Sequence, residues 1–121
     1  MASELRVNTL KDASGNNSIA TSFVAGGSAK VWHTGTADGT SLEDSFNVSS
    51  LTDTATGKQT INISSAMSND DYSAMATCNN NTLICSRISG KGTGSYASTM
   101  STPSNTDTDV RNSTTVHGDL A

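Results

Sequence analysis

Apolar and polar residues alternate with a two-residue period in the middle of the chain, which is typical of half-buried β-strands. Phe46 and Val48 are separated and flanked by polar residues, and so are Ile61 and Ile63. The segment between the two patterns, residues 52–58, is rich in Thr, Asp and Gly, which favour turns. We therefore expect two strands that form a β-hairpin or a neighbouring antiparallel pair.

The second half of the chain predicts further short strands. A strand over 72–78, an asparagine-rich turn over 79–81 and a returning strand over 83–88 predict a second hairpin, because Asn tolerates the left-handed backbone of tight turns. Two more strands and two loops are expected after the turn: strands over 96–100 and 110–116, and loops over 90–95 and 101–107.

Helical periodicity is weak along the whole chain. Apolar residues rarely recur at spacings of three and four, and β-branched residues, Gly and Asn interrupt most windows. We therefore expect no helix. The fold class predicted is all-β, with a small antiparallel β-sandwich or knob.

The first forty residues differ from the rest. Leu5, Val7 and Leu10 form a short apolar ridge, and the polar turn 12–17 follows it. A segment this short cannot make its own core, so the ridge is expected to lie against a partner surface or against other copies of the chain. We accordingly predict an extended N-terminal anchor and neck and a separate β domain; the ranges are 1–40 and 41–121.

The composition indicates that few large apolar side chains are available for a hydrophobic core. Leu, Ile, Val and Phe account for 19 of the 121 residues, below the roughly 20% at which disorder is normally suspected. Disordered chains of this kind also carry a high net charge, whereas this chain has a formal net charge of -4 and 15% charged residues. A core shared between copies in an obligate oligomer reconciles the two observations.

Charge and hydropathy argue against several partners. The chain has seven basic and eleven acidic residues without a basic cluster, so nucleic-acid binding is not expected. The chain has no apolar run of about 18 residues, so insertion into a membrane is not expected. The first residues lack a basic stretch followed by an apolar run, so we expect the chain to be made and kept in a cytosol until it is assembled.

The two cysteines flank the asparagine-rich turn. Cys78 and Cys85 are expected to face each other on paired strands, either as small buried side chains or as a cross-strand disulfide formed after release from the cytosol. Metal binding is the weakest alternative, because His33 and His117 lie far from the cysteines in the sequence without zinc-type spacing.

Catalytic chemistry is not indicated. The two histidines accompany no recognisable nucleophile motif, and surface or subunit-contact positions are expected for both. The carboxylates are scattered, and Asp70 and Asp71 are interpreted as solvated turn residues instead of calcium ligands because the regular loop spacing is absent. We predict a protein that is not an enzyme and takes no cofactor or metal.

Several stretches resemble a known family. Residues 3–17 resemble the start of small tail-fibre and virion structural proteins of tailed bacteriophages, particularly marine ones. Three further stretches resemble the β domain of the same proteins: residues 29–32, 44–53 and 61–72. Residues 116–121 are similar too. The resemblance implies an intertwined homotrimer with the N-terminal segment docked on other virion proteins and the β domain facing outward. The expected location is the virion, after assembly in the host cytoplasm.

The function expected is a short trimeric fibre or knob that contributes to host adhesion. Leu5, Val7 and Leu10 would anchor it to the tail or capsid. Exposed loops would meet a host-surface glycan through these residues: Asn79, Asn80, Asn81, Thr82, Lys91, Thr93 and Ser95. The alternatives are a capsid decoration protein without a receptor and a polysaccharide depolymerase. The depolymerase is disfavoured because no pair of carboxylates can be placed on one surface.

Overall fold

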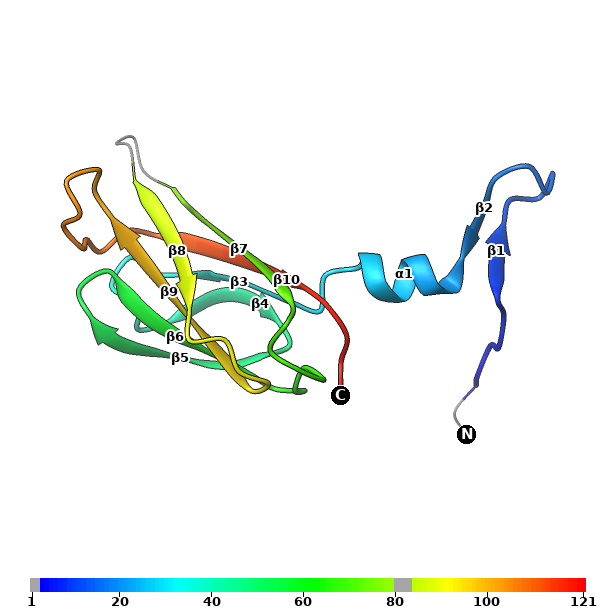
Figure 1. Cartoon of the computed structure of the whole chain (residues 1–121), viewed down its shortest axis with the longest axis horizontal. Coiled ribbons are helices and arrows are strands. Elements are labelled where there is room, and N and C mark those ends of the chain that lie inside the picture. The colour runs from blue at the N-terminus through cyan, green and yellow to red at the C-terminus, as the bar shows by residue number, and fades with distance from the viewer. Residues whose placement is uncertain (1–2, 80–83) are drawn as a thin grey trace.

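Two four-stranded antiparallel sheets pack face to face in a computed structural model that describes residues 3–79 and 84–121 (Figure 1). An N-terminal arm of one hairpin and one helix extends from the sandwich. The elements are β1 (Thr9–Lys11), β2 (Ser18–Ala20), α1 (Thr21–Gly27), β3 (Val31–Gly35), β4 (Leu42–Phe46), β5 (Val48–Ala55), β6 (Lys58–Ile63), β7 (Ser73–Cys78), β8 (Cys85–Ser89), β9 (Ser95–Ser101) and β10 (Asn112–His117). The prediction of a mostly β chain with antiparallel sheets is confirmed.

The strand order explains how the sandwich closes. One sheet has the order β4-β3-β10-β7 and the other has the order β5-β6-β9-β8. The chain crosses between the sheets at four connections, which are β4 to β5, β6 to β7, β7 to β8 and β9 to β10. Consecutive strands at these connections belong to opposite layers, so each layer contains strands that are far apart in the sequence.

Inward-facing side chains of both layers form one core. Val31 and Val116 come from one sheet and Ile61 and Tyr96 from the other, and all four are fully buried. Burial alternates along β3, β6 and β10, as the two-residue period of a strand requires. The core is therefore thin but continuous, and it lies between the layers.

The first predicted hairpin is confirmed with one correction. β5 and β6 pair antiparallel through a short turn at residues 56–57. The pattern around Phe46 and Val48 is not one strand, because Asn47 between them adopts a left-handed backbone with φ of 57°. Asn47 is the corner where the chain leaves one sheet for the other. Its side chain accepts a hydrogen bond from the backbone N–H of Ser65 at 2.7 Å.

The second predicted hairpin is wrong. β7 pairs with β10, whereas β8 pairs with β9, so the two strands that flank the asparagine-rich segment lie in different sheets. A turn-forming sequence shows that the chain reverses, but it does not say which strand becomes the hydrogen-bonded partner. Strands over 96–100 and 110–116 are confirmed as β9 and β10, with shifted bounds.

The expectation of a chain without helices is also wrong. α1 spans Thr21–Gly27, and the backbone N–H of Ser28 closes it by donating to the carbonyl of Val24. Seven residues are too few for helical periodicity to be visible in a sequence window. The predicted boundary at residue 40 needs a correction as well, because β3 pairs with β10 and β4 and so belongs to the sandwich.

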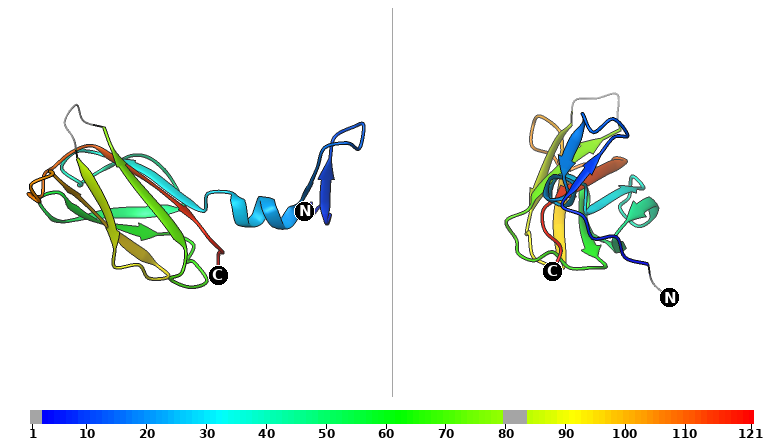
Figure 2. Two further views of the ribbon diagram at one scale, coloured as in Figure 1. Left: turned by 45° about the horizontal axis from the view of Figure 1, so that its top comes forward. Right: turned by 90° about the vertical axis from the view of Figure 1, so that its right-hand side faces the viewer.

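Strand pairing defines two ends of the sandwich (Figure 2). At one end, which we call the far end, Cys78 pairs with Asn112, and at the other, the arm end, Ser73 pairs with His117. The arm joins β3 at the arm end, where the backbone N–H of Lys30 donates to Val116. The far end carries the loops 36–41, 56–57 and 102–111. The arm end carries segments 64–72, 90–94 and 118–121.

Candidate functional site

Exposed apolar side chains gather on the N-terminal arm. In the part of the chain that the structure describes, nine large apolar side chains are exposed, and six of them belong to the arm. They are Leu5, Val7, Leu10, Ile19, Phe23 and Val24. Leu5 is 80% exposed and Phe23 is 73% exposed. An apolar surface this concentrated is typical of an interaction site.

Local chemistry shapes the arm hairpin. The carboxylate of Asp12 accepts hydrogen bonds from the Ser14 hydroxyl at 3.0 Å, the Asn16 backbone N–H at 3.0 Å and the Asn17 side-chain amide at 2.7 Å. These bonds, that of Ser14 foremost, hold the pKa of Asp12 below its usual value. Gly15 supplies the left-handed backbone of the turn, with φ of 74°. The turn predicted over 12–17 is confirmed.

Few contacts hold the arm's elements in place. Leu10 and Ile19 face each other across β1 and β2. The backbone N–H of Thr21 donates to the carbonyl of Asn8 at 3.0 Å. No residue of α1 is buried. A two-stranded hairpin and a seven-residue helix are both marginal in water without tertiary packing.

A buried polar network crosses the core between the sheets. His33 on β3 is only 1% exposed, and its Nδ1 lies 2.7 Å from the Thr114 hydroxyl on β10. Its Nε2 lies 3.2 Å from Nε2 of Gln59 on β6 in the opposite sheet. The amide nitrogen can only donate, so His33 Nε2 accepts and Nδ1 carries the proton that is donated to Thr114. Burial lowers the pKa of His33 to about 4, so the ring is neutral near pH 7.

The network continues to Tyr96 and Asn112. The Tyr96 hydroxyl lies 2.5 Å from the Thr114 hydroxyl, and burial raises the pKa of Tyr96 to about 12. The Gln59 amide nitrogen also donates to the Asn112 side-chain oxygen, and the Ser98 hydroxyl oxygen lies 3.3 Å from the same nitrogen. These side chains are buried, and their hydrogen bonds connect the two sheets.

The surface position predicted for His33 is therefore wrong. The signal was present in the sequence, because Val31, His33 and Gly35 share one face of an alternating strand. Polar residues on such a face must find hydrogen bonds inside the protein.

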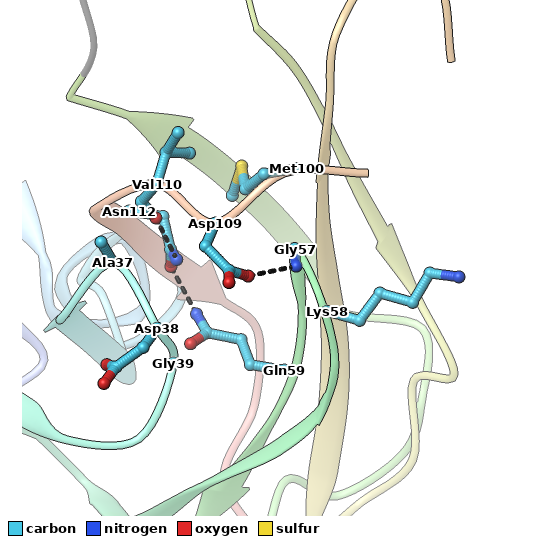
Figure 3. A pocket seen from close by; sticks show the side chains of 10 residues that line it. All are labelled: Ala37, Asp38, Gly39, Gly57, Lys58, Gln59, Met100, Asp109, Val110 and Asn112. Carbon is cyan, nitrogen blue, oxygen red and sulfur yellow. Dashed lines mark hydrogen bonds between the residues drawn. The ribbon is translucent and has the colours of Figure 1, made fainter. Parts of the chain in front are cut away.

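A small cavity opens at the far end beside this network (Figure 3). The turns at Gly39 and Gly57 and the segment before β10 enclose it, and Gln59 forms part of its inner wall. Asp109 accepts a hydrogen bond from the Gly57 backbone N–H at 2.5 Å. No sequence motif pointed to this cavity, because its residues come from three separated loops.

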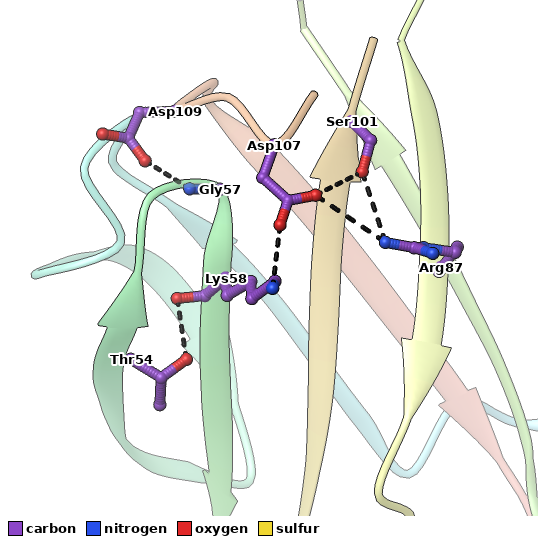
Figure 4. A network of polar contacts seen from close by, with 7 residues as sticks. All are labelled: Thr54, Gly57, Lys58, Arg87, Ser101, Asp107 and Asp109. Atoms are coloured by element: carbon purple, nitrogen blue, oxygen red, sulfur yellow. Dashed lines mark hydrogen bonds and ion pairs between the residues drawn. The ribbon is translucent and has the colours of Figure 1, made fainter. Parts of the chain in front are cut away.

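Ion pairs hold the neighbouring strands together (Figure 4). Asp107 lies 2.8 Å from the Lys58 ammonium and 3.7 Å from the Arg87 guanidinium. It also accepts a hydrogen bond from the Ser101 hydroxyl at 2.7 Å. The hydrogen bonds from Lys58 and Ser101 keep the pKa of Asp107 low. The loop 102–111 is thereby tied to β6, β8 and β9.

The described residues of the two predicted receptor loops lie at opposite ends of the sandwich. Lys91 is at the arm end, where its ammonium donates to the Tyr72 carbonyl at 2.9 Å. Thr93 accepts a backbone hydrogen bond from Met67, and Ser95 begins β9. Asn79 is at the far end, bonded to the carbonyl of Arg111. The other predicted residues of that loop lie outside the described residues: Asn80, Asn81 and Thr82. Asn79 and Lys91 therefore do not belong to one surface.

The cysteines are not paired. Cys78 is half-buried on β7 and Cys85 is exposed on β8, and both are free thiols. The predicted cross-strand opposition fails for the same reason as the hairpin, because the two strands belong to different sheets.

Three further findings concern other kinds of site and the similarity of the chain to known proteins. Across residues 3–79 and 84–121, no three His, Cys, Asp or Glu side chains gather in a way that could hold a metal ion. In the same ranges, no helix has the length and apolar character needed to cross a membrane. No protein-family model, no curated protein and no solved structure matches the chain.

Proposed function

We propose that the chain is a non-enzymatic virion structural protein of a tailed bacteriophage. In this proposal it forms a short homotrimeric fibre or knob: the arm attaches to the particle and to the arms of two other copies, and the sandwich projects outward. The observation that carries the proposal is the concentration of exposed apolar side chains on an arm that has little packing of its own. The resemblance of residues 3–17 to phage virion proteins supplies the kind of particle.

The arm divides between the two kinds of contact. Leu5, Val7 and Leu10 lie before the hairpin turn and are proposed to contact another virion protein. Phe23 and Val24 on α1 lie nearer the sandwich and are proposed to pack around the trimer axis. Burying a side chain of this size is worth roughly 1.5–3 kcal/mol, and three chains multiply the gain.

The far end is the surface proposed to face the host. Attachment through the arm turns the arm end, including Lys91 and Thr93, toward the particle. The loops of the far end then face away from the particle, and a host-surface glycan is the proposed partner. Weak single contacts suffice when three copies on one fibre act together.

The test uses particles of the phage that encodes the chain. We expect mass spectrometry of purified particles to find the protein, and particle imaging to show three copies per site on tail or capsid. Particles assembled with a chain lacking residues 1–15 should lack the protein. Its absence from purified wild-type particles, or full occupancy by the truncated chain, would contradict the proposal.

Substitutions in the far-end loops distinguish adhesion from decoration. We expect variants of loops 36–41 and 102–111 to occupy the particle normally and to slow its adsorption to host cells. Normal adsorption with normal occupancy would favour capsid decoration without a receptor role.

A further inference from the structure

The outer face of the sheet β4-β3-β10-β7 carries large apolar side chains in one row. The register pairs Phe46 on β4 with Trp32 on β3, and Trp32 with Thr115 on β10. Thr115 in turn pairs with Met75 on β7. Directly paired residues lie on the same face of a sheet, so these four residues form a row across all four strands, which we call the aromatic row. Their neighbours along β3 and β10 are buried, so the row points away from the core.

The aromatic row is open to solvent. Phe46 is 54% exposed and Met75 is 60% exposed, and Trp32 beside Phe46 is half-buried. Trp32 is the only tryptophan of the chain. A chain with few large apolar residues would gain most from placing its largest one in the core, yet this one lies on the outer face. Exposed apolar side chains that adjoin one another, unlike single scattered ones, are typical of an interaction site.

A row of polar side chains runs beside the aromatic row. Asp44 pairs with Thr34, and Thr34 pairs with Ser113, whose hydroxyl oxygen lies 2.9 Å from that of Thr34. Thr77 completes this polar row on β7. The two rows are two residues apart along each strand, which is roughly 7 Å. A flat ligand that covers the aromatic row therefore reaches the polar row with the groups at its edge.

The area of the aromatic row is too small for a stable protein interface. A standard interface buries roughly 800 Å² on each partner, whereas a fully covered aromatic side chain buries about 150–250 Å². The row offers two aromatic side chains and one methionine, and all three are already partly covered by the sheet. A narrow ligand fits this surface better than a second copy of the chain or another protein does.

The charge of the face argues for a neutral ligand. The register places the following residues on it: Trp32, Thr34, Asp44, Phe46, Ser73, Met75, Thr77, Ser113, Thr115 and His117. Asp44 is the only Asp, Glu, Lys or Arg among them. A ligand with carboxylate or sulfate groups would meet no Lys or Arg there, whereas neutral hydroxyl groups can donate to Asp44 and exchange hydrogen bonds with Ser and Thr.

A sugar ring has the two kinds of surface that these rows require. Its C–H groups carry a partial positive charge and pack on the negative face of an aromatic ring. Its hydroxyl groups lie at the ring edge, where they pair with hydroxyl and carboxylate side chains. Four strands at their usual spacing span roughly 14 Å, enough for a linear chain of about three sugar rings.

We propose that the outer face of β4-β3-β10-β7 binds a neutral linear oligosaccharide that lies across the strands. Trp32 and Phe46 stack on its sugar rings, and Asp44, Thr34 and Ser113 form hydrogen bonds with its hydroxyl groups. This surface is on the side of the sandwich, separate from the far-end loops proposed to face the host. The site needs neither the arm nor the trimer, so its failure would leave the proposed function untouched.

The experiment uses Trp32 as a built-in reporter, because fluorescence excited selectively at tryptophan comes from this residue alone. The full chain is titrated up to about 10 mM with neutral hexasaccharides of cellulose, xylan, mannan, laminarin and amylose, and with an acidic hexasaccharide of alginate. Phe46→Ala removes one stacking ring and keeps the reporter. Phe23→Ala is the matched control, because it removes an exposed phenylalanine from the arm. Calorimetry with Trp32→Ala measures the heat of binding without the reporter.

We expect at least one neutral hexasaccharide to shift the emission of the wild type saturably and the alginate hexasaccharide to have little effect. Phe46→Ala should bind about fivefold more weakly, Phe23→Ala should bind as the wild type does, and Trp32→Ala should lose the heat of binding. Melting curves show that each variant is folded. If Trp32→Ala does not fold, Phe46→Ala decides, because its side chain is more than half exposed.

Three results would overturn the proposal. The first is a wild type that responds to none of the neutral hexasaccharides, or to the acidic one equally well. The second is a Phe46→Ala variant that binds as tightly as the wild type. The third is an emission shift that appears without sugar as the protein concentration rises and is lost in Phe46→Ala, which would assign the aromatic row to contacts between copies of the chain.

Discussion

Burial of His33 makes this residue the main acid-sensitive group of the core. Its pKa is about 4 in the folded chain and 6.5 when unperturbed, so the unfolded chain binds the proton more readily between these values. The contribution of the neutral His33 to the free energy of unfolding is therefore fully present above about pH 6.5 and is lost as the pH falls toward 4. The pKa difference corresponds to about 3 kcal/mol at most. The pKa values of three carboxylates are also lowered from 3.8, so their contributions to stability are lost only as the pH falls below about that value. They are Asp12, Asp38 and Asp107.

We predict that the free energy of unfolding, measured with urea, decreases by about 2–3 kcal/mol between pH 7 and pH 4.5. His33→Asn should be less stable at pH 7 and should lose most of this pH dependence, because its side chain does not titrate. His117→Asn, which changes the half-buried histidine at the end of β10, is the matched control for removal of an imidazole. Equal slopes for His33→Asn and the wild type would contradict the assignment.

At the scale of elements, β5 and β6 show what alternation along the chain predicts well. Ile61 and Ile63 face the core because they are two residues apart on one strand, and the nearby turn residues bring β5 alongside. The same reasoning failed for β7 and β8. Their apolar and polar residues also alternate, but the partner of each strand is far away in the sequence and is chosen by packing in the sandwich.

The β5–β6 turn depends on Gly57. Its φ of 68° is unfavourable for other residues, and a Cβ would stand 2.5 Å from the Thr108 nitrogen and 2.6 Å from the Met100 oxygen. We predict that Gly57→Ala lowers the free energy of unfolding by at least about 2 kcal/mol, because the left-handed backbone and the contact with main-chain atoms both oppose it.

Gly94→Ala is the matched control, since a Cβ there meets no atom within 4 Å and the backbone is not left-handed. Urea unfolding of both variants should show a large loss for Gly57→Ala and a change within about 0.5 kcal/mol for Gly94→Ala. Similar losses in the two variants would mean that the turn at Gly57 does not have the close packing described above.

At the scale of the whole molecule, the sandwich and the arm differ in how they are stabilised. The sandwich has a continuous core and a buried hydrogen-bond network between its sheets, whereas the arm exposes most of its apolar side chains. The proposed trimer would bury them. Such an interface would account for a chain that is poor in large apolar residues and low in charge.

We predict that light scattering after size exclusion finds a trimer for the wild type and a monomer for Phe23→Ser. Phe23 on α1 is 73% exposed and is proposed to lie at the trimer axis. Phe46→Ser is the control, because Phe46 on β4 is also an exposed aromatic residue, at 54%, but belongs to the sandwich. It should remain trimeric. A wild type that is monomeric at tens of micromolar would contradict the trimer.

The sequence by itself determined the β-rich class, the β5–β6 hairpin, the polar turn 12–17 and the apolar ridge from Leu5 to Leu10. Each of these depends on residues close together along the chain, where periodicity and turn chemistry act directly. Only the tertiary structure decided which sheet holds β7 and β8, that His33 lies in the core, and that Lys91 and Asn79 lie at opposite ends. The cavity beside Gln59 belongs to the same group, because strand pairing over long sequence separations brings its three loops together, and local patterns do not encode such pairing.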